Sequence, residues 1–297
     1  MSTSIGAFRL DRVVESEGAF APISEMLPTL DRAKLAAADW IRPHYLDAND
    51  SALMCFQSFV LRTARHTILI DTCVGNDKER PLRPNWHRQQ FPYLARLAAV
   101  GVQPEEVDLV MCTHLHTDHI GWNTRLVDGR WVPTFPNARY LFARKEYDYW
   151  EAENRQTLAA GNPLPSYGAY VDSVLPIVEA GRATMVDSDH EIETGIHLEA
   201  AYGHTPGSCL LHAKNGGAHA VFIGDAMHTP VQLVDPSWSS KFCTDPIASA
   251  QVRRTICEQY AETATTLVAA HFPSPTIGTI RRGQPGRSEF RLELASG

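Results

Sequence analysis

Short apolar runs separated by turn residues dominate the hydrophobic pattern of this chain. The runs Ser51–Val60 and His66–Asp71 predict a pair of strands, and Val107–Cys112 predicts a buried strand. The sequence Asn215-Gly216-Gly217 between two such runs predicts a tight hairpin. Further strands are predicted at Arg139–Ala143, Leu198–Tyr202, Leu210–Ala213, Ala218–Ile223 and Thr266–Ala270, and the tail Gly278–Leu294 is predicted to form a hairpin around Gln284-Pro285-Gly286.

A helical period appears in fewer segments. His87–Val100 predicts an amphipathic helix that ends at Gly101, and its apolar side is expected to carry Phe91, Leu94 and Ala98. Lys145–Glu153 predicts a second helix, followed by a loop over residues 155–168. Asp245-Pro246 opens a third, because Asp is a good N-cap and Pro suits the first helical position. Its expected buried stripe is Val252, Ile256 and Tyr260. Strands dominate each half and helices follow, which predicts an α/β fold.

Composition fits one large globular enzyme domain and excludes several other classes. The chain has 297 residues, of which 44% are hydrophobic, so it is long enough for a substantial core. The net charge of −7, with scattered Lys and Arg, argues against a nucleic-acid partner. Since no apolar stretch approaches eighteen residues and no secretory signal opens the chain, we expect no membrane partner and a cytoplasmic location.

The six cysteines are widely spaced and contain no CxxC pair. This spacing suits free thiols in a reducing compartment. Cys112 lies two residues before the first histidine of a His-rich segment. We interpret it as a core residue and keep metal ligation as a minor alternative.

The most informative segment is His114-Leu115-His116-Thr117-Asp118-His119, directly after the predicted strand Val107–Cys112. Imidazoles and a carboxylate are ligands that Zn²⁺ prefers. A loop that follows a strand can hold them around an ion. The alternative is a polar loop that is merely rich in histidine.

Later residues complete a ligand set, since His204, Asp225 and His271 each follow another predicted strand. Seven candidate ligands are too many for one tetrahedral ion and fit two. Zinc is the first choice of ion, while the same residues also admit Mn, Co or Fe.

These motifs, HLHTDH, GHTPGS, GDAMH and AHF, resemble those of the metallo-β-lactamase superfamily from about Phe56 to His271. The resemblance implies a four-layer αββα sandwich over residues 51–297, with residues 1–50 as an extension packed on it, and a homodimer. It also implies the ligand assignment: His114, His116 and His204 hold one metal, Asp118, His119 and His271 hold the other, and Asp225 bridges them.

The chemistry expected of such a site is hydrolysis, in which a metal-bridged hydroxide attacks an ester carbonyl. Asp118 is the best candidate to pass a proton to the leaving group, with pure ligation as the alternative. Asp71 ends the predicted strand His66–Asp71 and is a candidate to accept the second ring N–H of a ligand histidine. A loop-capping role for Asp71 is equally compatible with the sequence.

The substrate class is expected to be a lactone or another carboxylic ester. Lactonases of this family usually carry a Tyr three residues after the bridging Asp, where this chain has His228. With His228 at this position, and in the sequence around His271, the chain resembles the organophosphate-hydrolase branch of the family. Phosphotriester hydrolysis is therefore the second hypothesis. A mononuclear-iron sulfur dioxygenase and a non-catalytic metal-stabilised binding protein are further alternatives.

Residues that contact the substrate are harder to predict. His228 is a candidate to hydrogen-bond the substrate or the attacking water, with a supporting or surface role as the alternative. Trp122 and Phe272 are candidates to line a pocket, although aromatic residues are more often part of the core. Phe20, Met26 and Leu27 are weaker candidates of the same kind, and residues 145–170 are a candidate lid. The remaining histidines are assigned no function: His44, His66, His87, His190, His197, His212 and His219.

Overall fold

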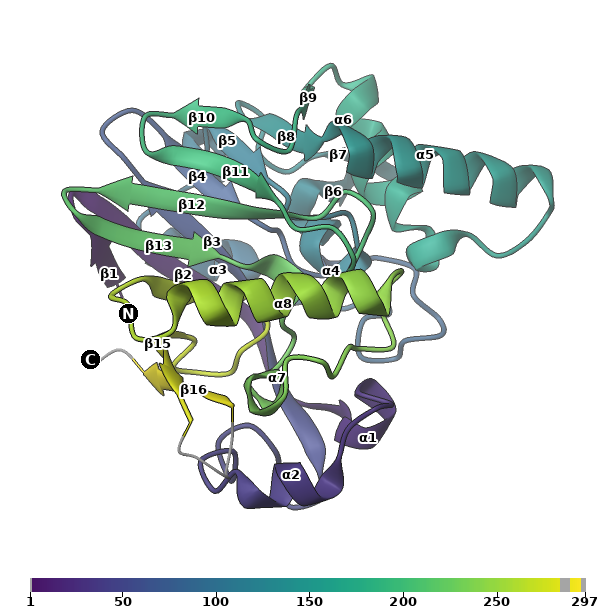
Figure 1. The fold of residues 1–297 in the computed structure, drawn as a ribbon. Helices are drawn as coiled ribbons and strands as arrows, with labels where there is room; N and C mark the ends of the chain where they lie inside the picture. The colour runs from purple at the N-terminus through teal and green to yellow at the C-terminus, as the bar shows by residue number, and fades with distance from the viewer. Residues whose placement is uncertain (1, 284–288, 295–297) are drawn as a thin grey trace. The chain divides into compact units, whose positions relative to one another are not determined.

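The computed structural model (Figure 1) describes residues 2–283 and 289–294. Its described residues belong to two compact units. The first unit comprises Met1–Ser16 with Phe56–Ser188, and the second comprises Glu17–Cys55 with Asp189–Gly297. Each carries a mixed seven-stranded sheet and its own helices. The predicted α/β class is therefore confirmed.

The first sheet has the strand order β1-β2-β3-β4-β5-β8-β9. The predicted pair Ser51–Val60 and His66–Asp71 is confirmed as antiparallel β3 and β4, and β5 and β8 continue the sheet in parallel. The strands are β1 Ser2–Ile5, β2 Phe8–Pro22, β3 Ser51–Arg62, β4 Thr67–Ile70, β5 Leu109–Met111, β8 Arg139–Ala143 and β9 Ala183–Val186, with a separate hairpin of β6 Thr124–Val127 and β7 Arg130–Pro133.

Helices and short 3-10 or π turns cover the first sheet and join its strands. Tyr93 and Leu97 of α3 pack with Leu69 and Val110 in one buried apolar cluster. The elements are α3 Tyr93–Ala99, η1 Pro104–Glu106, α4 Thr117–Ile120, η2 Gly121–Asn123, α5 Arg144–Ala159, η3 Pro165–Gly168, η4 Tyr170–Val174 and α6 Leu175–Glu179.

The second sheet has the order β10-β11-β12-β13-β14-β15-β16. The predicted hairpin is confirmed: β12 and β13 pair up to Asn215 and Ala218, and both Gly216 and Gly217 have positive φ, as a two-residue turn of this type requires. The strands are β10 Glu191–Glu193, β11 Ile196–Ala200, β12 Cys209–Asn215, β13 Ala218–Phe222, β14 Thr266–Val268, β15 Ile277–Arg282 and β16 Phe290–Leu294.

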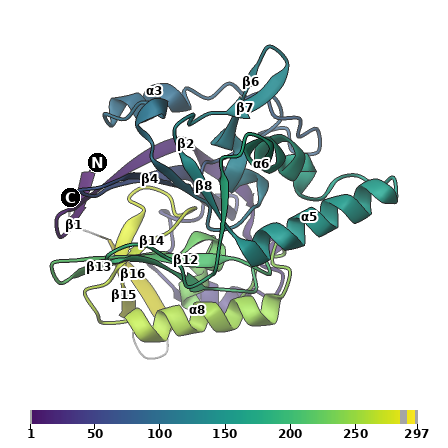
Figure 2. The same cartoon turned by 90° about the horizontal axis from the view of Figure 1, so that it is seen from above.

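Helix α8 (Pro246–Tyr260) lies along one face of the second sheet (Figure 2). The Asp245 side chain accepts hydrogen bonds from the backbone N–H groups of Ile247 and Ala248, so the predicted N-cap is confirmed. Ile256 and Tyr260 are buried as predicted and Val252 packs partly buried beside them. The unit also contains α1 Ile23–Met26, α2 Arg32–Ala37, η5 Gly224–Ala226 and α7 Val231–Val234.

The prediction of a helix over His87–Val100 is wrong in its first half. Helix α3 begins only at Tyr93, because Pro92 precedes it and proline disfavours a helical residue before it. The two hydrogen bonds between the Asn76 side chain and the Phe91 backbone hold the preceding segment as a loop. The buried side is therefore Tyr93 and Leu97 rather than the predicted stripe.

Two other segments differ from prediction or confirm it in part. Helix α5 continues to Ala159, so the predicted loop over 155–168 starts later and contains the turn η3. The tail strands β15 and β16 pair as predicted, while the predicted turn Gln284-Pro285-Gly286 lies outside the described residues. Among the described helices, none combines the length and apolar character that crossing a bilayer requires.

Candidate metal centre

The predicted metal-binding loop follows β5 in the first unit. His114 and His119 are buried, whereas His116 and Asp118 are partly exposed. Helix α4 begins at Thr117, immediately after His116, and therefore contains Asp118 and His119. A strand end followed by a short helix thus places all four candidate ligands in one compact loop, as the motif predicts.

Ring nitrogens in this loop are oriented by their neighbours. The Nε2 of His114 and the Nδ1 of His116 face each other at 3.1 Å. The Nδ1 of His114 contacts the Thr113 hydroxyl at 3.2 Å. The Nδ1 of His119 lies 2.9 Å from Oδ2 of Asp71, which is the contact expected for Asp71. If Asp71 accepts the Nδ1 proton of His119, the Nε2 lone pair of that ring is left for a metal.

Three side chains that the sequence analysis did not single out hold the loop backbone. Glu146, in the first turn of α5, is buried and accepts a hydrogen bond of 3.0 Å from the backbone N–H of Leu115, between two candidate ligands. The hydroxyl of Ser166 accepts one from the Thr117 N–H at 3.1 Å. The guanidinium of Arg80 donates to the Thr117 hydroxyl at 2.8 Å. In the sequence, Glu146 is marked only as an acidic residue within a predicted helix, which is a weak signal for a role at the metal loop.

The end of the loop is bound tightly to the segment after β4. The Thr72 N–H donates to the carbonyl of His119 at 2.7 Å, and the Gly121 N–H donates to the carbonyl of Cys73 at 2.7 Å. A Cβ on Gly121 would lie 1.8 Å from the Val74 carbonyl oxygen, so only glycine fits there.

A buried carboxylate from β2 braces the same region. Glu15 accepts hydrogen bonds from the N–H groups of Val74 and Gly75, each at 3.0 Å, and from the indole N–H of Trp122 at 2.7 Å. Burial raises the pKa of Glu15 to about 7, whereas the three donated hydrogen bonds act in the opposite direction. Glu15 thus connects the residues after β4 to those after α4.

The candidate ligands of the second unit gather around Asp225. Its Oδ2 lies 3.2 Å from Nε2 of His204 and 3.2 Å from Nε2 of His228, and its Oδ1 lies 3.0 Å from Nε2 of His271. All four side chains are buried. They follow β11, β13 and β14, as predicted. A carboxylate among three imidazole nitrogens is a donor set that suits a divalent ion.

The outer nitrogens of two of these rings have partners. The Nδ1 of His271 lies 3.0 Å from the carbonyl oxygen of Cys55, which can accept its proton. The Nδ1 of His204 lies 3.6 Å from the sulfur of Cys243. Both rings are therefore held with Nε2 toward Asp225, as metal ligands require. In contrast, neither ring nitrogen of the buried His228 has a hydrogen-bond partner among the described residues.

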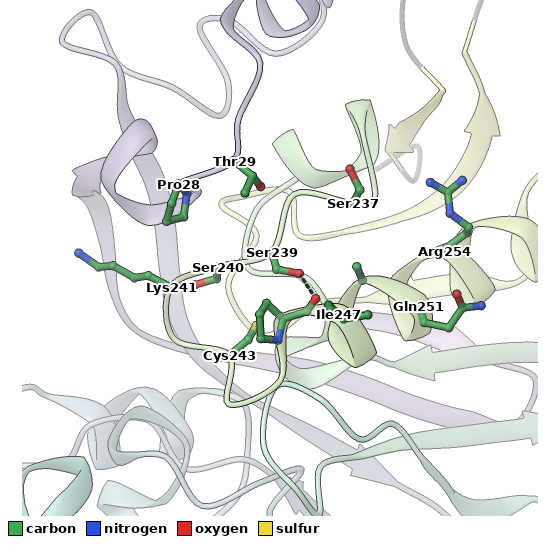
Figure 3. A pocket seen from close by; sticks show the side chains of 12 residues that line it. Pro28, Thr29, Ser237, Ser239, Ser240, Lys241, Cys243, Ile247, Gln251 and Arg254 are labelled. Carbon is green, nitrogen blue, oxygen red and sulfur yellow. Dashed lines mark hydrogen bonds between the residues drawn. The ribbon is translucent and has the colours of Figure 1, made fainter.

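A cavity of about 630 Å³ lies in the second unit (Figure 3). Cys243, the sulfur of which contacts His204, is one of its walls, and Ala250 of α8 is another. The volume suits a small organic molecule. Most of the lining is apolar or hydroxyl-bearing, and its charged members are Lys241 and Arg254. The lining residues are Pro28, Thr29, Ser237, Ser239, Ser240, Lys241, Cys243, Pro246, Ile247, Ala250, Gln251 and Arg254.

The two aromatic residues proposed to contact the substrate are deeply buried. Trp122 is 4% exposed, stacks on Tyr93 with ring centroids 5.0 Å apart, and donates to Glu15. Phe272 is fully buried in the apolar cluster of the second unit. These contacts favour packing roles, and a substrate contact for either residue stays a prediction. Cys112 is also buried, with its sulfur 3.6 Å from the Asn123 side-chain nitrogen.

Comparison with known families agrees with the motifs. The family model described as the metallo-beta-lactamase superfamily matches residues 57–271. Among solved structures, one described as the hydrolase AbOPH in the beta lactamase superfamily aligns with a TM-score of 0.80 at 23% identity, covering 100% of this chain and 97% of that one. This likeness confirms the predicted metallo-β-lactamase fold.

Other relatives carry more specific names. An N-acyl homoserine lactonase from Bacillus cereus is 24% identical over 60% of this chain, and the lactonase AttM from Azorhizobium caulinodans is 26% identical over 63% of it. Each match spans 66% of the relative, just under two thirds of its length. A structure of AidC, described as a dizinc quorum-quenching lactonase with a product N-acyl homoserine, aligns with a TM-score of 0.77 at 20% identity, over 100% of this chain and 97% of AidC.

Proposed function

Because the chain belongs to the metallo-beta-lactamase superfamily, we propose that it is a metal-dependent hydrolase of lactones or related carboxylic esters. The observation that carries the proposal is the cluster around Asp225, where three buried histidines direct ring nitrogens at one carboxylate. In the first unit, His114, His116 and His119 also present ring nitrogens that suit a divalent ion.

In this proposal the two sets of ligands hold two divalent ions together. As the family motifs imply, His114, His116 and His204 would hold one ion, Asp118, His119 and His271 would hold the other, and Asp225 would bridge them. Asp225 has two oxygens and can serve both. Zinc is the first choice, because a relative of similar fold is described as dizinc, and Mn, Co or Fe suits the same ligands.

Bound divalent ions supply a water of lowered pKa and polarise the substrate carbonyl. The side chains of the chain then provide orientation and proton transfer. Asp118 is partly exposed and has a carboxylate suited to carry a proton to the leaving alkoxide. Asp71 fixes the tautomer of His119, and Cys55 does so for His271 through its carbonyl.

His228 has a distinct place in this proposal. Its Nε2 lies 3.2 Å from Asp225, yet neither ring nitrogen has a hydrogen-bond partner among the described residues. A buried imidazole whose Nδ1 has no hydrogen-bond partner among the described residues is costly, which supports a role in which a substrate oxygen supplies the missing contact. We therefore assign His228 to substrate binding and to the reacting centre.

The named relatives support the lactone class. Two curated relatives are N-acyl homoserine lactonases, and AidC is described with an N-acyl homoserine product. The cavity beside Cys243 suits the aliphatic arm of such a substrate, since its lining is largely apolar. Lactones that bear an aliphatic acyl chain are thus the proposed substrates.

One observation favours a second function. The lactonase pattern has a Tyr where this chain has His228, and a hydroxide generated by bound metal ions can attack the tetrahedral phosphorus of a phosphotriester as well as a carbonyl. Organophosphate triester hydrolysis is therefore the second candidate.

The family resemblance further suggests a homodimer, and sedimentation of the purified chain as a monomer alone would exclude it.

The experiment combines metal analysis with a substrate panel. Protein purified without added ions is expected to contain about two divalent ions per chain and to hydrolyse acyl lactones faster than aryl esters or phosphotriesters. Faster turnover of the triester would reverse the order of the two functions. One iron per chain with oxygen-dependent thiol consumption would indicate a sulfur dioxygenase instead. Tight small-molecule binding without turnover in the metal-loaded protein would indicate a binding protein.

A further inference from the structure

Three histidines lie on adjacent strands of the second sheet, outside the candidate metal centre. His197 of β11 is paired directly with His212 of β12, and His219 stands near the start of β13. The rings of His197 and His212 stack with centroids 4.8 Å apart at 10°, and those of His212 and His219 lie 5.3 Å apart at 25°. We call these three residues the histidine row. None of its members is a candidate ligand of the proposed active site.

A continuous set of hydrogen-bond contacts runs through the row. The Nε2 of His212 lies 2.9 Å from a carboxylate oxygen of Glu199, and the Nδ1 of His212 lies 3.0 Å from the Nε2 of His219. The Nδ1 of His219 lies 3.3 Å from the hydroxyl of Thr265. Since Glu199 only accepts, His212 carries its proton on Nε2 and presents a bare Nδ1 to His219.

Both facing rings are neutral at physiological pH. Burial is the main cause that lowers the pKa of His212 and of His219 to about 4. Neutral imidazoles are the form that binds transition metals. His219 is partly exposed, so an ion has access from solvent on that side.

The tautomers also suit metal binding. In the hydrogen-bonded row, His219 donates its Nε2 proton to His212. If that proton moves through solvent to Nδ1, the Thr265 hydroxyl can accept it and both facing nitrogens become bare. No net proton is gained or lost in this exchange. Glu199 then has the role of the carboxylate that commonly accepts the outer N–H of a metal-bound histidine.

We propose that the Nδ1 of His212 and the Nε2 of His219 form a second, peripheral site for a divalent transition-metal ion such as Cu²⁺ or Zn²⁺. Water completes the coordination shell. The ring of His197 stacks on His212 and restricts its rotation. The ring of Tyr260 packs edge-on against His219, and its buried hydroxyl, which has no hydrogen-bond partner among the described residues, is available to a water on the ion.

Copper is the most sensitive probe, because Cu²⁺ binds imidazole most strongly among the common divalent ions. Zinc-loaded protein is titrated with Cu²⁺, and electron paramagnetic resonance is used to count the nitrogens on the copper while released zinc is measured. The wild type is expected to take up copper on two imidazole nitrogens without releasing zinc. His219→Gln is expected to lose this signal, and Glu199→Gln to bind copper about tenfold or more weakly.

Controls separate the site from non-specific binding and from misfolding. His44→Gln removes an exposed histidine elsewhere in the second unit and is expected to leave the copper signal unchanged. Glu199 is exposed, so its substitution tests the site without disturbing the core. Equal copper binding by wild type and His219→Gln, or release of zinc in step with copper uptake, would overturn the proposal. Hydrolysis is not a readout, and the comparison of copper binding by wild type and His219→Gln does not depend on the proposed function.

Discussion

Glu146 accepts a hydrogen bond from the backbone N–H of Leu115 at 3.0 Å, although thirty-one positions separate the two residues in the sequence. The same carboxylate oxygen accepts from the indole N–H of Trp150 at 2.7 Å. A buried acid from α5 thus fixes the loop backbone between His114 and His116. The geometry of the candidate ligands depends on a residue that binds no metal itself.

Glu146→Ala is expected to lower the free energy of unfolding by about 1–3 kcal/mol, because two buried donors lose their acceptor. Glu146→Gln keeps an acceptor oxygen and is expected to cost less. Urea denaturation of the two variants measures the difference, and metal content reports the state of the loop. Equal stability of Glu146→Ala and wild type would show that Leu115 finds another acceptor.

Asp71→Asn is expected to weaken metal binding by about tenfold to a hundredfold, the usual effect of removing the partner of a ligand histidine. An amide in place of Oδ2 donates to Nδ1 of His119, so the ring proton moves to Nε2, where the metal is proposed to bind. Competition with a chelator measures the affinity. Asp108→Asn is the matched control, since Asp108 is exposed and caps Thr67 in the same unit.

Gly121→Ala is expected to disrupt the ligand loop. The backbone at Gly121 has ordinary helical angles, so the cost is steric: the new Cβ would meet the Val74 carbonyl oxygen at 1.8 Å. Gly129→Ala, where φ is +76° and no atom lies within 4 Å, is expected to cost only about 1–2 kcal/mol. The unfolding temperatures of the two variants compare the cost of a steric clash at position 121 with the cost of backbone strain at position 129. If Gly121→Ala unfolds at the same temperature as Gly129→Ala, the expectation is refuted.

Ala250→Phe fills the cavity beside Cys243 and tests its proposed role for the acyl arm. Each methylene of the acyl chain that is buried in the cavity contributes about 0.8 kcal/mol to binding. A variant that excludes two or more of them therefore lowers kcat/KM by about tenfold. Long-chain lactones are expected to lose this much and short-chain lactones little. Ala159→Phe, on the exposed end of α5, is the control. An equal loss for all chain lengths would place the acyl arm elsewhere.

Acid is expected to destabilise the second unit through the histidine row. His212 and His219 have folded pKa values of about 4, lowered mainly by burial, against about 6.5 in an unfolded chain. Between these values the unfolded chain binds more protons, so stability falls as pH decreases from 6.5 toward 4. Urea midpoints across this range are expected to fall less steeply for His219→Gln than for wild type. His44→Gln should keep the wild-type slope.

The sequence by itself determined the elements with strong local signals. The turn Asn215-Gly216-Gly217 was predictable because glycine readily adopts the positive φ that a tight hairpin turn requires, and the cap Asp245-Pro246 because proline fixes φ near its helical value. The ligand motif from His114 to His119 was predictable because few other segments concentrate metal-binding groups so densely. The start of α3 was missed, although Pro92 was a local signal against the longer helix.

The tertiary structure alone decided the partners of these elements. Arg80 and Glu146 hold the metal loop and Glu15 braces the segments next to it, and no local pattern distinguishes such acids and bases from surface charges. The histidine row likewise exists only because β11, β12 and β13 lie side by side in one register. Hydrogen bonds and packing between distant segments depend on the folded chain, whereas turns and caps depend on neighbouring residues.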